Sequence, residues 1–144
     1  MKSQFTDMYF STIKISASQI FYQKKYVFAF VNHKPFSDGH ILVCPTRKEK
    51  KFQDLNDIEL IELMVAVRNI SSNLKRFYNT EHTQIVIQNG ELSGQSIDHC
   101  HVHIIPIINN NKNKDIKIDA INKEPRTDDD MEKEALLYRK ELGL

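Results

Sequence analysis

The chain has few cysteines, no long apolar run and almost no excess charge, and each shortage excludes a class of protein. Its two cysteines, Cys44 and Cys100, stand in apolar segments, which favours reduced core thiols over a disulfide framework. No stretch reaches the apolar length of a transmembrane helix, and the N-terminus lacks the apolar core of a signal peptide. A net charge of +1 argues against binding nucleic acid through bulk electrostatics. We therefore expect a protein of a reducing compartment, the cytoplasm and also the nucleus, without membrane or nucleic-acid partners.

What the sequence does contain is a pattern of short strands and two helices, within a single domain of 144 residues. Apolar runs bounded by turn residues predict four strands, at 26–31, 40–44, 83–88 and 97–108. Helical periodicity and capping residues predict a long amphipathic helix at 56–78 and a terminal helix at 127–143. The Asn- and Lys-rich stretch over 109–125 is expected to be a mobile loop. Together these elements predict an α+β domain with a mainly antiparallel sheet.

The most informative stretch is HCHVHII, in which His99, His101 and His103 alternate with apolar residues. On an extended strand, side chains two residues apart point to the same face, so the three imidazoles would form a row with a spacing of about 7 Å. Each ring raises the cost of charging its neighbours, which favours a neutral, nucleophilic histidine. The row predicts proton transfer, metal binding or nucleophilic attack. A half-exposed strand that merely carries polar histidines is the plain alternative.

A second surface is predicted where two strand segments pair as a hairpin across the turn-rich stretch NHKPFSDG. By strand parity, Phe30 and Asn32 share one face of this hairpin, and so do His40 and Leu42. Apolar surface beside an amide and an imidazole suits a flat, partly polar ligand. An ordinary core edge would have a similar composition.

These motifs together resemble a known family. HCHVHII fits the pattern that names the histidine triad (HIT) nucleotide hydrolases and transferases; NHKPFSDGHILVCP is similar to the family's hairpin, and QNGELSGQSIDHCHVHIIP to its active-site arm. With DDDMEKEALLYR near the C-terminus, the chain is most similar to the fragile-histidine-triad branch, the diadenosine triphosphate hydrolases. The resemblance implies a mainly antiparallel five-stranded sheet with one long central helix and a C-terminal helix. It also implies a homodimer formed through the central helix and a strand.

The resemblance further implies a two-step hydrolysis of a dinucleoside polyphosphate to a nucleoside monophosphate and a diphosphate. His101 would attack the α-phosphorus and carry a covalent nucleotidyl intermediate, while the carbonyl of His99 fixes its tautomer. His99 and His103 would bind the non-bridging oxygens, with His40 supporting His103. Gln88 would contact the phosphate and steer the leaving group and the water.

The other roles implied by the resemblance concern the phosphate loop and the nucleoside. Gln95 and Ser96 would donate hydrogen bonds to phosphate, and Asn32 would hold the ribose hydroxyls. Three apolar side chains would sandwich the base: Ile15, Phe30 and Leu42. From the residues alone, Asn32 could equally be a turn residue, Gln95 could serve loop geometry, and the apolar three could be plain core.

Two alternatives and one cofactor question stay open at this point. Ser96 replaces a threonine of the closest branch and matches the phosphoramidase branch, so a nucleoside phosphoramidate hydrolase is the main alternative, although the chain has no tryptophan and that branch has a Trp-containing tail. A nucleotide-binding signalling protein with incidental turnover is a second alternative. No metal ligand is assigned, because the motif lacks a carboxylate or fourth ligand, and Mg²⁺ would act only as counterion of the polyphosphate.

Overall fold

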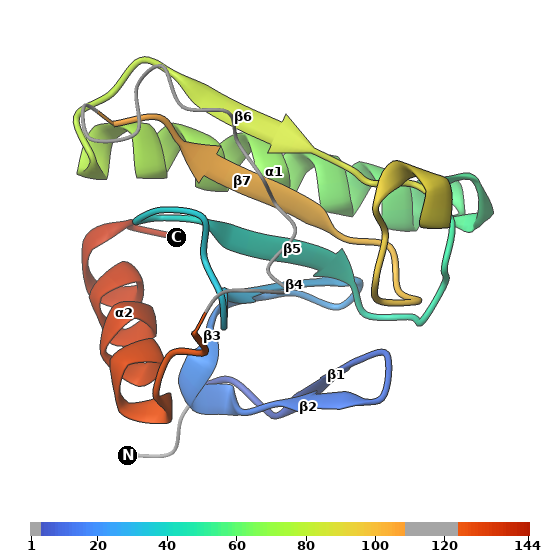
Figure 1. Ribbon diagram of the computed structural model, residues 1–144, viewed down its shortest axis with the longest axis horizontal. Helices are drawn as coiled ribbons and strands as arrows, with labels where there is room; N and C mark the ends of the chain where they lie inside the picture. Colours follow the sequence, from blue (N-terminus) through green and yellow to red (C-terminus); the bar gives the residue numbers. More distant parts are fainter. Residues whose placement is uncertain (1–3, 109–123) are drawn as a thin grey trace.

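In the computed structural model, residues 4–108 and 124–144 are described, and they form two antiparallel sheets flanked by helices (Figure 1). In chain order the elements are β1 Met8–Phe10, β2 Ile13–Ile15, the 3-10 helix η1 Ala17–Gln19, β3 Ile20–Gln23, β4 Val27–Val31, β5 Ile41–Pro45, η2 Phe52–Asp54, α1 Asp57–Phe77, β6 Thr83–Val86, η3 Glu91–Ser93, β7 Val102–Pro106 and α2 Asp128–Glu141. Most of the loop predicted over 109–125 lies outside the described residues.

The main sheet has five strands in the order β3-β4-β5-β7-β6, and each neighbouring pair is antiparallel. With α1 and α2 beside it, this sheet confirms the predicted α+β fold. The small sheet β1-β2 was not anticipated as a separate element. In Figure 1 it lies apart from the main sheet, below β3. No helix within the described ranges is both long and apolar enough to cross a membrane.

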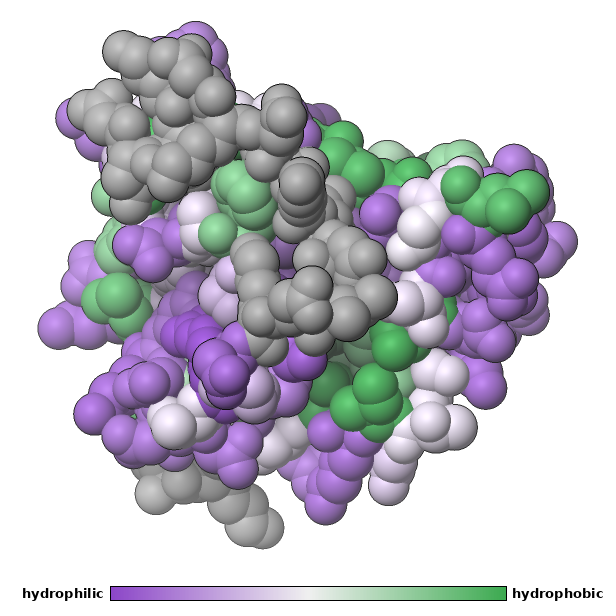
Figure 2. Space-filling view, in the orientation of Figure 1, coloured by the Kyte–Doolittle hydropathy of each residue, from purple (hydrophilic) through white to green (hydrophobic). Residues whose placement is uncertain are grey.

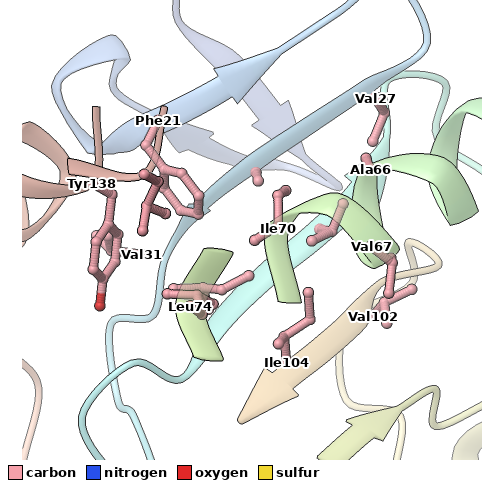
Figure 3. Packing of buried hydrophobic residues seen from close by; sticks show 14 of the residues in the cluster. Phe21, Val27, Val31, Ala66, Val67, Ile70, Leu74, Val102, Ile104 and Tyr138 are labelled. Carbon is pink, nitrogen blue, oxygen red and sulfur yellow. The ribbon is translucent and has the colours of Figure 1, made fainter. Parts of the chain in front are cut away.

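Helix α1 covers one face of the main sheet and begins where the sequence predicts. The side chain of Asn56 accepts the N–H of Glu59 at 2.9 Å, and the Glu59 carboxylate accepts the N–H of Asn56 at 3.0 Å, which completes a capping box. The buried side of the helix packs on alternate residues of the strands, as Figure 3 shows for Ala66, Val67, Ile70 and Leu74 against Val27, Val31, Val102 and Ile104. The predicted stripe of α2 is buried in the same core: Met131, Ala135, Tyr138 and Leu142.

The opposite face of the sheet holds the residues of interest for function. Phe30 of β4 lies directly opposite Leu42 of β5, and Leu42 lies directly opposite His103 of β7. Phe10 and Ile15 from β1 and β2 pack with Phe30 and Leu42 in a second buried cluster on this side. The shared face that parity predicted for Phe30 and Leu42 is therefore confirmed.

The predicted strand over 97–108 is wrong at its start, because β7 begins only at Val102. The β5–β7 ladder pairs Val43 with Val102, and continuing it would require a donor from Pro45, which has no N–H. The N–H of Cys100 instead bonds the carbonyl of Glu49 at 2.6 Å.

His99 and His101 consequently lie on an irregular segment before the strand, and only His103 belongs to β7. The N–H of His99 bonds the carbonyl of Ile97 at 2.8 Å, a local turn that a strand would not contain. The three histidines thus do not form the regular row that simple alternation predicts. The half-exposed alternative fails as well, because all three side chains are buried.

Candidate active site

A pocket of about 380 Å³ opens on the sheet face opposite α1. It brings together eight of the predicted site residues: His101, His103, Gln88, Ser96, Asn32, Phe30, Leu42 and Ile15. His99, His40 and Gln95 do not line it, although all three are buried. The predicted nucleophile and several predicted phosphate- and nucleoside-binding residues therefore share one cavity, while His99, His40 and Gln95 are buried next to other parts of the protein.

His101 presents one ring nitrogen for chemistry. Its Nδ1 lies 2.7 Å from the carbonyl oxygen of His99, and because a carbonyl only accepts, Nδ1 carries the proton and Nε2 the lone pair. Burial lowers the pKa of His101, so the ring is neutral at pH 7. The ring of Phe10 packs edge-on against it, with centroids 4.9 Å apart. His101 is therefore a fixed, uncharged imidazole that lines the pocket and carries its lone pair on Nε2.

The ring of His99 is fully committed to the protein. Its Nδ1 accepts the N–H of Ser11 at 2.9 Å, and its Nε2 donates to the carbonyl of Pro45 at 2.7 Å. The side chain is buried, which lowers the pKa of His99. The prediction that this ring binds a phosphate oxygen is therefore corrected, because neither nitrogen has a hydrogen bond left to give. Only its carbonyl, which holds His101, acts on the site.

His103 and His40 form a hydrogen-bonded pair whose protons can be assigned. The N–H of Phe36 points at His40 Nδ1 at 2.8 Å, so Nδ1 accepts and the proton of neutral His40 sits on Nε2. That N–H donates to His103 Nδ1 at 3.0 Å, which leaves the proton of His103 on its Nε2. This Nε2 has no hydrogen-bond partner among the described residues, although it is buried.

The Nε2–H of His103 is thus a fixed hydrogen-bond donor without an acceptor among the described residues. Burial first, and then the neighbouring His101 and His40 rings, lower the pKa of His103 to about 3, so the ring stays neutral. A buried donor without a partner costs about 1–3 kcal/mol. An anionic oxygen in the pocket would remove that cost, which is the arrangement expected of a group that binds a phosphoryl oxygen.

Asn32 keeps its amide hydrogens available to a ligand. Its Oδ1 accepts the N–H of Lys34 at 2.9 Å, which turns its Nδ2 toward His40 Nε2 at 3.1 Å. With the proton of that nitrogen directed to His103, His40 Nε2 does not accept from Asn32, and none of the other described residues accepts from the Asn32 amide. The side-chain oxygen of Asn32 thus has the turn role that was the alternative, because it accepts from Lys34. The NH₂ group of the same side chain stays available to a ligand in the pocket.

The arm that follows β6 supplies the remaining polar groups. Gln88 and Ser96 line the pocket, and Gly94 lies under the Gln88 amide, where an added Cβ would be 2.5 Å from Nε2. Gln95, by contrast, points away: its Oε1 accepts the N–H of Gly90, and its Nε2 donates to the carbonyls of Lys50 and Ile97. The Gln95 side chain therefore holds the loop together and is not placed to contact phosphate.

Several lining residues were not anticipated from the sequence. Phe10, which touches His101, belongs to the short sheet β1-β2, and its apolar neighbours gave no hint of its position. Met131 and Asp128 come from α2, where Met131 was assigned to the core alone. Two polar side chains, Lys14 and Gln19, also line the cavity. Nothing in the local sequence pattern distinguishes these residues, because their place depends on how distant segments pack.

Within the described ranges, no group of three or more histidine, cysteine or acidic side chains is arranged to hold a metal ion. The hydrogen bonds explain why the histidines are poor ligands together: His99 is occupied, and His103 carries a proton on its inward nitrogen. His101 alone offers a lone pair. The absence of a histidine-bound metal stays a prediction.

The fold and the tethered histidines define a histidine triad protein. The family model described as HIT domain matches residues 14–110, and the chain belongs to that family. It is 38% identical over 133 residues to the bis(5'-adenosyl)-triphosphatase of Dictyostelium discoideum, covering 90% of this chain and 89% of that protein. It is 35% identical over 137 residues to the nitrilase and fragile histidine triad fusion protein NitFhit of Caenorhabditis elegans, covering 90% of this chain but only 31% of the relative.

A solved structure is similar along nearly the whole chain. The Plasmodium falciparum diadenosine triphosphate hydrolase, in complex with cyclomarin A, superimposes with a TM-score of 0.81 at 31% identity, covering 99% of this chain and 87% of that one. The likeness places this chain near the fragile-histidine-triad branch that its motifs suggest.

Proposed function

We propose that this protein hydrolyses dinucleoside polyphosphates of the diadenosine triphosphate class to a nucleoside monophosphate and a nucleoside diphosphate. The observation that carries the proposal is the tautomer of His101: the His99 carbonyl holds Nδ1–H, which leaves the lone pair on Nε2 of a side chain that lines the pocket. The names of relatives, among them triphosphatases and a diadenosine triphosphate hydrolase, support the substrate class.

The chemistry proceeds in two displacements at the α-phosphorus. The Nε2 lone pair of His101 forms a bond to phosphorus while the bond to the bridging oxygen breaks, and the nucleoside diphosphate leaves with the electron pair of that bond. Water then attacks the nucleotidyl-His101 phosphorus, the phosphorus–nitrogen bond breaks, and the nucleoside monophosphate is released with loss of a proton to solvent. The carbonyl of His99 accepts from Nδ1–H throughout and stabilises the charge that the ring gains on attack.

The other pocket groups bind and orient the substrate. The His103 Nε2–H donates to a non-bridging oxygen, and Gln88 and Ser96 flank the bridging oxygen and the water. The Asn32 amide donates to the ribose hydroxyls, while Phe30 and Leu42, side by side on the sheet, contact the base. Ile15 covers the base from β2.

A nucleoside phosphoramidate is the second candidate substrate, because Ser96 does line the pocket, where a hydroxyl can assist a leaving amine. The decisive measurement is steady-state hydrolysis of diadenosine triphosphate, diadenosine tetraphosphate and adenosine phosphoramidate. We expect the triphosphate to have the highest kcat/KM. A higher kcat/KM for adenosine phosphoramidate would instead identify the protein as a nucleoside phosphoramidate hydrolase.

The matching variant is His101→Asn, with His82→Asn as control because His82 is exposed and outside the pocket. Loss of the nucleophile should lower kcat by about 10⁴-fold or more while nucleotide binding survives. The control should retain wild-type rates. Turnover that persists in His101→Asn would refute the assigned nucleophile. Binding without turnover by the wild type would favour the signalling alternative.

We also propose that the protein is a homodimer formed through α1 and β6. Strand β6 is an edge of the main sheet, and its Ile85 is 51% exposed. Ile58, Ile61 and Val65 are exposed at helical spacing along α1. Figure 2 shows hydrophobic surface along the upper edge of the molecule, in the region that β6 and α1 occupy in Figure 1. Burial of such a surface is what a second copy provides.

Light scattering tests this assembly. Ile61→Glu should shift the mass from dimer to monomer, whereas Leu136→Glu, at an exposed apolar position of α2, should not. A monomeric wild type would exclude the dimer.

The compartment and the counterion are proposals of smaller scope. Cys44 and Cys100 are free and buried, and burial raises the pKa of both thiols, which fits the cytoplasmic or nuclear setting predicted above. Mg²⁺ is proposed only as counterion of the polyphosphate. Chelation should then slow turnover of polyphosphate substrates and leave adenosine phosphoramidate unaffected.

A further inference from the structure

The nucleoside end of the pocket has apolar faces and few polar groups that could contact the edge of a base. Phe30, Leu42 and Ile15 supply flat contact, and these surfaces take any base equally well. Selectivity between bases needs hydrogen bonds to the base edge. His33, Lys34 and Asp128 are polar lining residues from the loop after β4 and from α2. Two more, Lys14 and Gln19, come from β2 and η1, the segments beside Ile15.

These two side chains differ in how they are engaged. Lys14 Nζ lies 3.4 Å from a carboxylate oxygen of Asp7, so its charge is paired outside the cavity. The Gln19 amide has no hydrogen-bond partner anywhere in the described part of the chain, and it is only partly exposed. It carries an acceptor and two donors on one planar group. Of these two side chains, Gln19 is therefore the one whose hydrogen-bonding groups are unused.

The backbone that carries Gln19 is held from two sides. The Asp7 carboxylate accepts the N–H of Ala17 at 2.7 Å, at the start of η1. From α2, the Arg139 guanidinium donates to the carbonyl of Ile20 at 2.8 Å and also to the carbonyl of Ala17. The residue thus enters the pocket from a fixed turn, and little ordering remains to be done when a ligand binds.

We propose that Gln19 reads the hydrogen-bonding edge of the base and favours adenine, an inference that rests on the proposed binding of a nucleotide in this pocket. The amide oxygen accepts from the exocyclic amino group of adenine, and the amide N–H donates to the adjacent ring nitrogen. Guanine offers two neighbouring acceptors at its corresponding N7 and O6 edge, which cannot use both functions of the amide.

The sharpest variant is Gln19→Arg, which replaces the amide acceptor with donors. Guanidinium N–H groups donate to the N7 and O6 acceptors of guanine together, whereas the amino group of adenine on the same edge finds no acceptor. The Kd ratio of GMP to AMP should therefore fall at least about tenfold relative to wild type. Gln19→Leu should weaken AMP by about 2- to 10-fold with little effect on the flat contacts. Gln4→Arg, at an exposed position outside the pocket, supplies the same change as control.

Calorimetric binding of AMP and GMP is the primary measurement, and the kcat/KM ratio of diadenosine to diguanosine triphosphate is the second. An unchanged GMP/AMP ratio in both Gln19 variants would overturn the inference even if the wild type hydrolyses diadenosine triphosphate. If the wild type binds AMP but hydrolyses nothing, the proposed function fails and the binding ratio still decides the role of Gln19. A wild type that binds neither nucleotide would overturn both. Thermal unfolding of each variant establishes that it is folded.

Discussion

At the scale of single residues, main-chain groups decide the proton positions of the histidines. A backbone N–H cannot accept and a backbone carbonyl cannot donate, so each contact with a ring nitrogen fixes a tautomer. The N–H of Ser11 and the carbonyl of Pro45 fix His99, and the N–H of Phe36 fixes His40. Ser11 makes this contact with a φ of 56°, a left-handed backbone that is uncommon for serine. The chemistry of the site is therefore prepared by main-chain groups of residues whose own side chains have no assigned role.

The first prediction concerns the His40–His103 hydrogen bond. His40→Leu removes the donor that keeps the His103 proton on the pocket side. Loss of a hydrogen bond to a charged phosphoryl group is worth about 1.5–3 kcal/mol, so kcat should fall by about 10- to 150-fold. His40→Gln, which can accept and donate at similar places, should restore much of the rate. The control is His82→Leu, and equal rates for His40→Leu and wild type would show that the proton assignment has no bearing on catalysis.

The second prediction concerns Gly94, where any side chain would displace Gln88. The added Cβ would lie 2.5 Å from Gln88 Nε2, and the φ of Gly94 is +96°. Gly94→Ala should therefore lower kcat/KM about tenfold or more. A double-mutant cycle separates the two causes. If Gly94 acts by placing Gln88, then Gly94→Ala should cost little in a Gln88→Ala background. Full additivity would assign the loss to backbone strain alone.

The residue pattern of the sequence predicted pairs on regular strands well and loop residues poorly. Parity placed Phe30 and Leu42 together because both lie inside β4 and β5. It failed for the ring of His99, whose position depends on a contact with Ser11, eighty-eight residues away. The role of Gln95 as a loop support was recognisable only as an alternative, since three hydrogen bonds to main-chain groups settle it.

At the scale of elements, the starts of the helices were predictable, and so were the two strands of the hairpin to within one residue, but the end of β6 and the start of β7 were not. Helix α1 begins at Asp57 and α2 at Asp128, each directly after its predicted cap, because caps are local signals. The start of β7 depends on Pro45 in another strand, which a single-segment pattern does not contain. The strand predicted over 83–88 likewise ends early, at Val86, which pairs with His103. Gln88 is thereby freed from the sheet to line the pocket.

The third prediction tests the cap of α1. Asn56→Ala removes the side-chain acceptor of the Glu59 N–H and should lower the free energy of unfolding by about 1 kcal/mol. Asn73→Ala, inside the same helix, should be neutral or slightly stabilising because alanine has the higher helix propensity. Urea denaturation measures both. An Asn56→Ala protein as stable as Asn73→Ala would mean that the tertiary contacts of α1 make the cap redundant.

At the scale of the whole molecule, the pocket is closed by segments from both ends of the chain. The N–H of Arg126 bonds the carbonyl of His33 at 2.9 Å, and its guanidinium donates to the carbonyl of Asn32 at 3.2 Å. These contacts bring the start of α2 to the loop that holds Asn32, the residue proposed to bind ribose. The sequence predicted α2 as a helix with a core stripe but not its place at the site. Docking of one element on another is decided by the summed packing of the fold rather than by local pattern.

The fourth prediction follows from burying neutral histidines in that assembled core. The pKa of His103 is about 3 in the folded protein and 6.5 for the free side chain, and the pKa values of His99 and His101 are also lowered by burial. Above pH 6.5 the His103 ring is neutral in both states, so it does not affect the pH dependence. As the pH falls below 6.5, His103 is protonated in the unfolded chain but stays neutral in the folded protein. Protonation therefore favours the unfolded state, and the free energy of unfolding decreases.

Because of His103 alone, the free energy of unfolding should therefore decrease by about 2 kcal/mol when the pH is lowered from 8 to about 5. Ordinary carboxylates titrate below this range. His103→Gln should be less sensitive to pH by about that amount, whatever its stability at pH 8. His82→Gln, which replaces an exposed histidine outside the pocket, is the matched control and should keep the wild-type slope. Urea unfolding at a series of pH values gives the slopes. Parallel curves for wild type and His103→Gln would mean that His103 takes up its proton in the folded protein, and the donor proposed to meet the phosphate would then be an imidazolium.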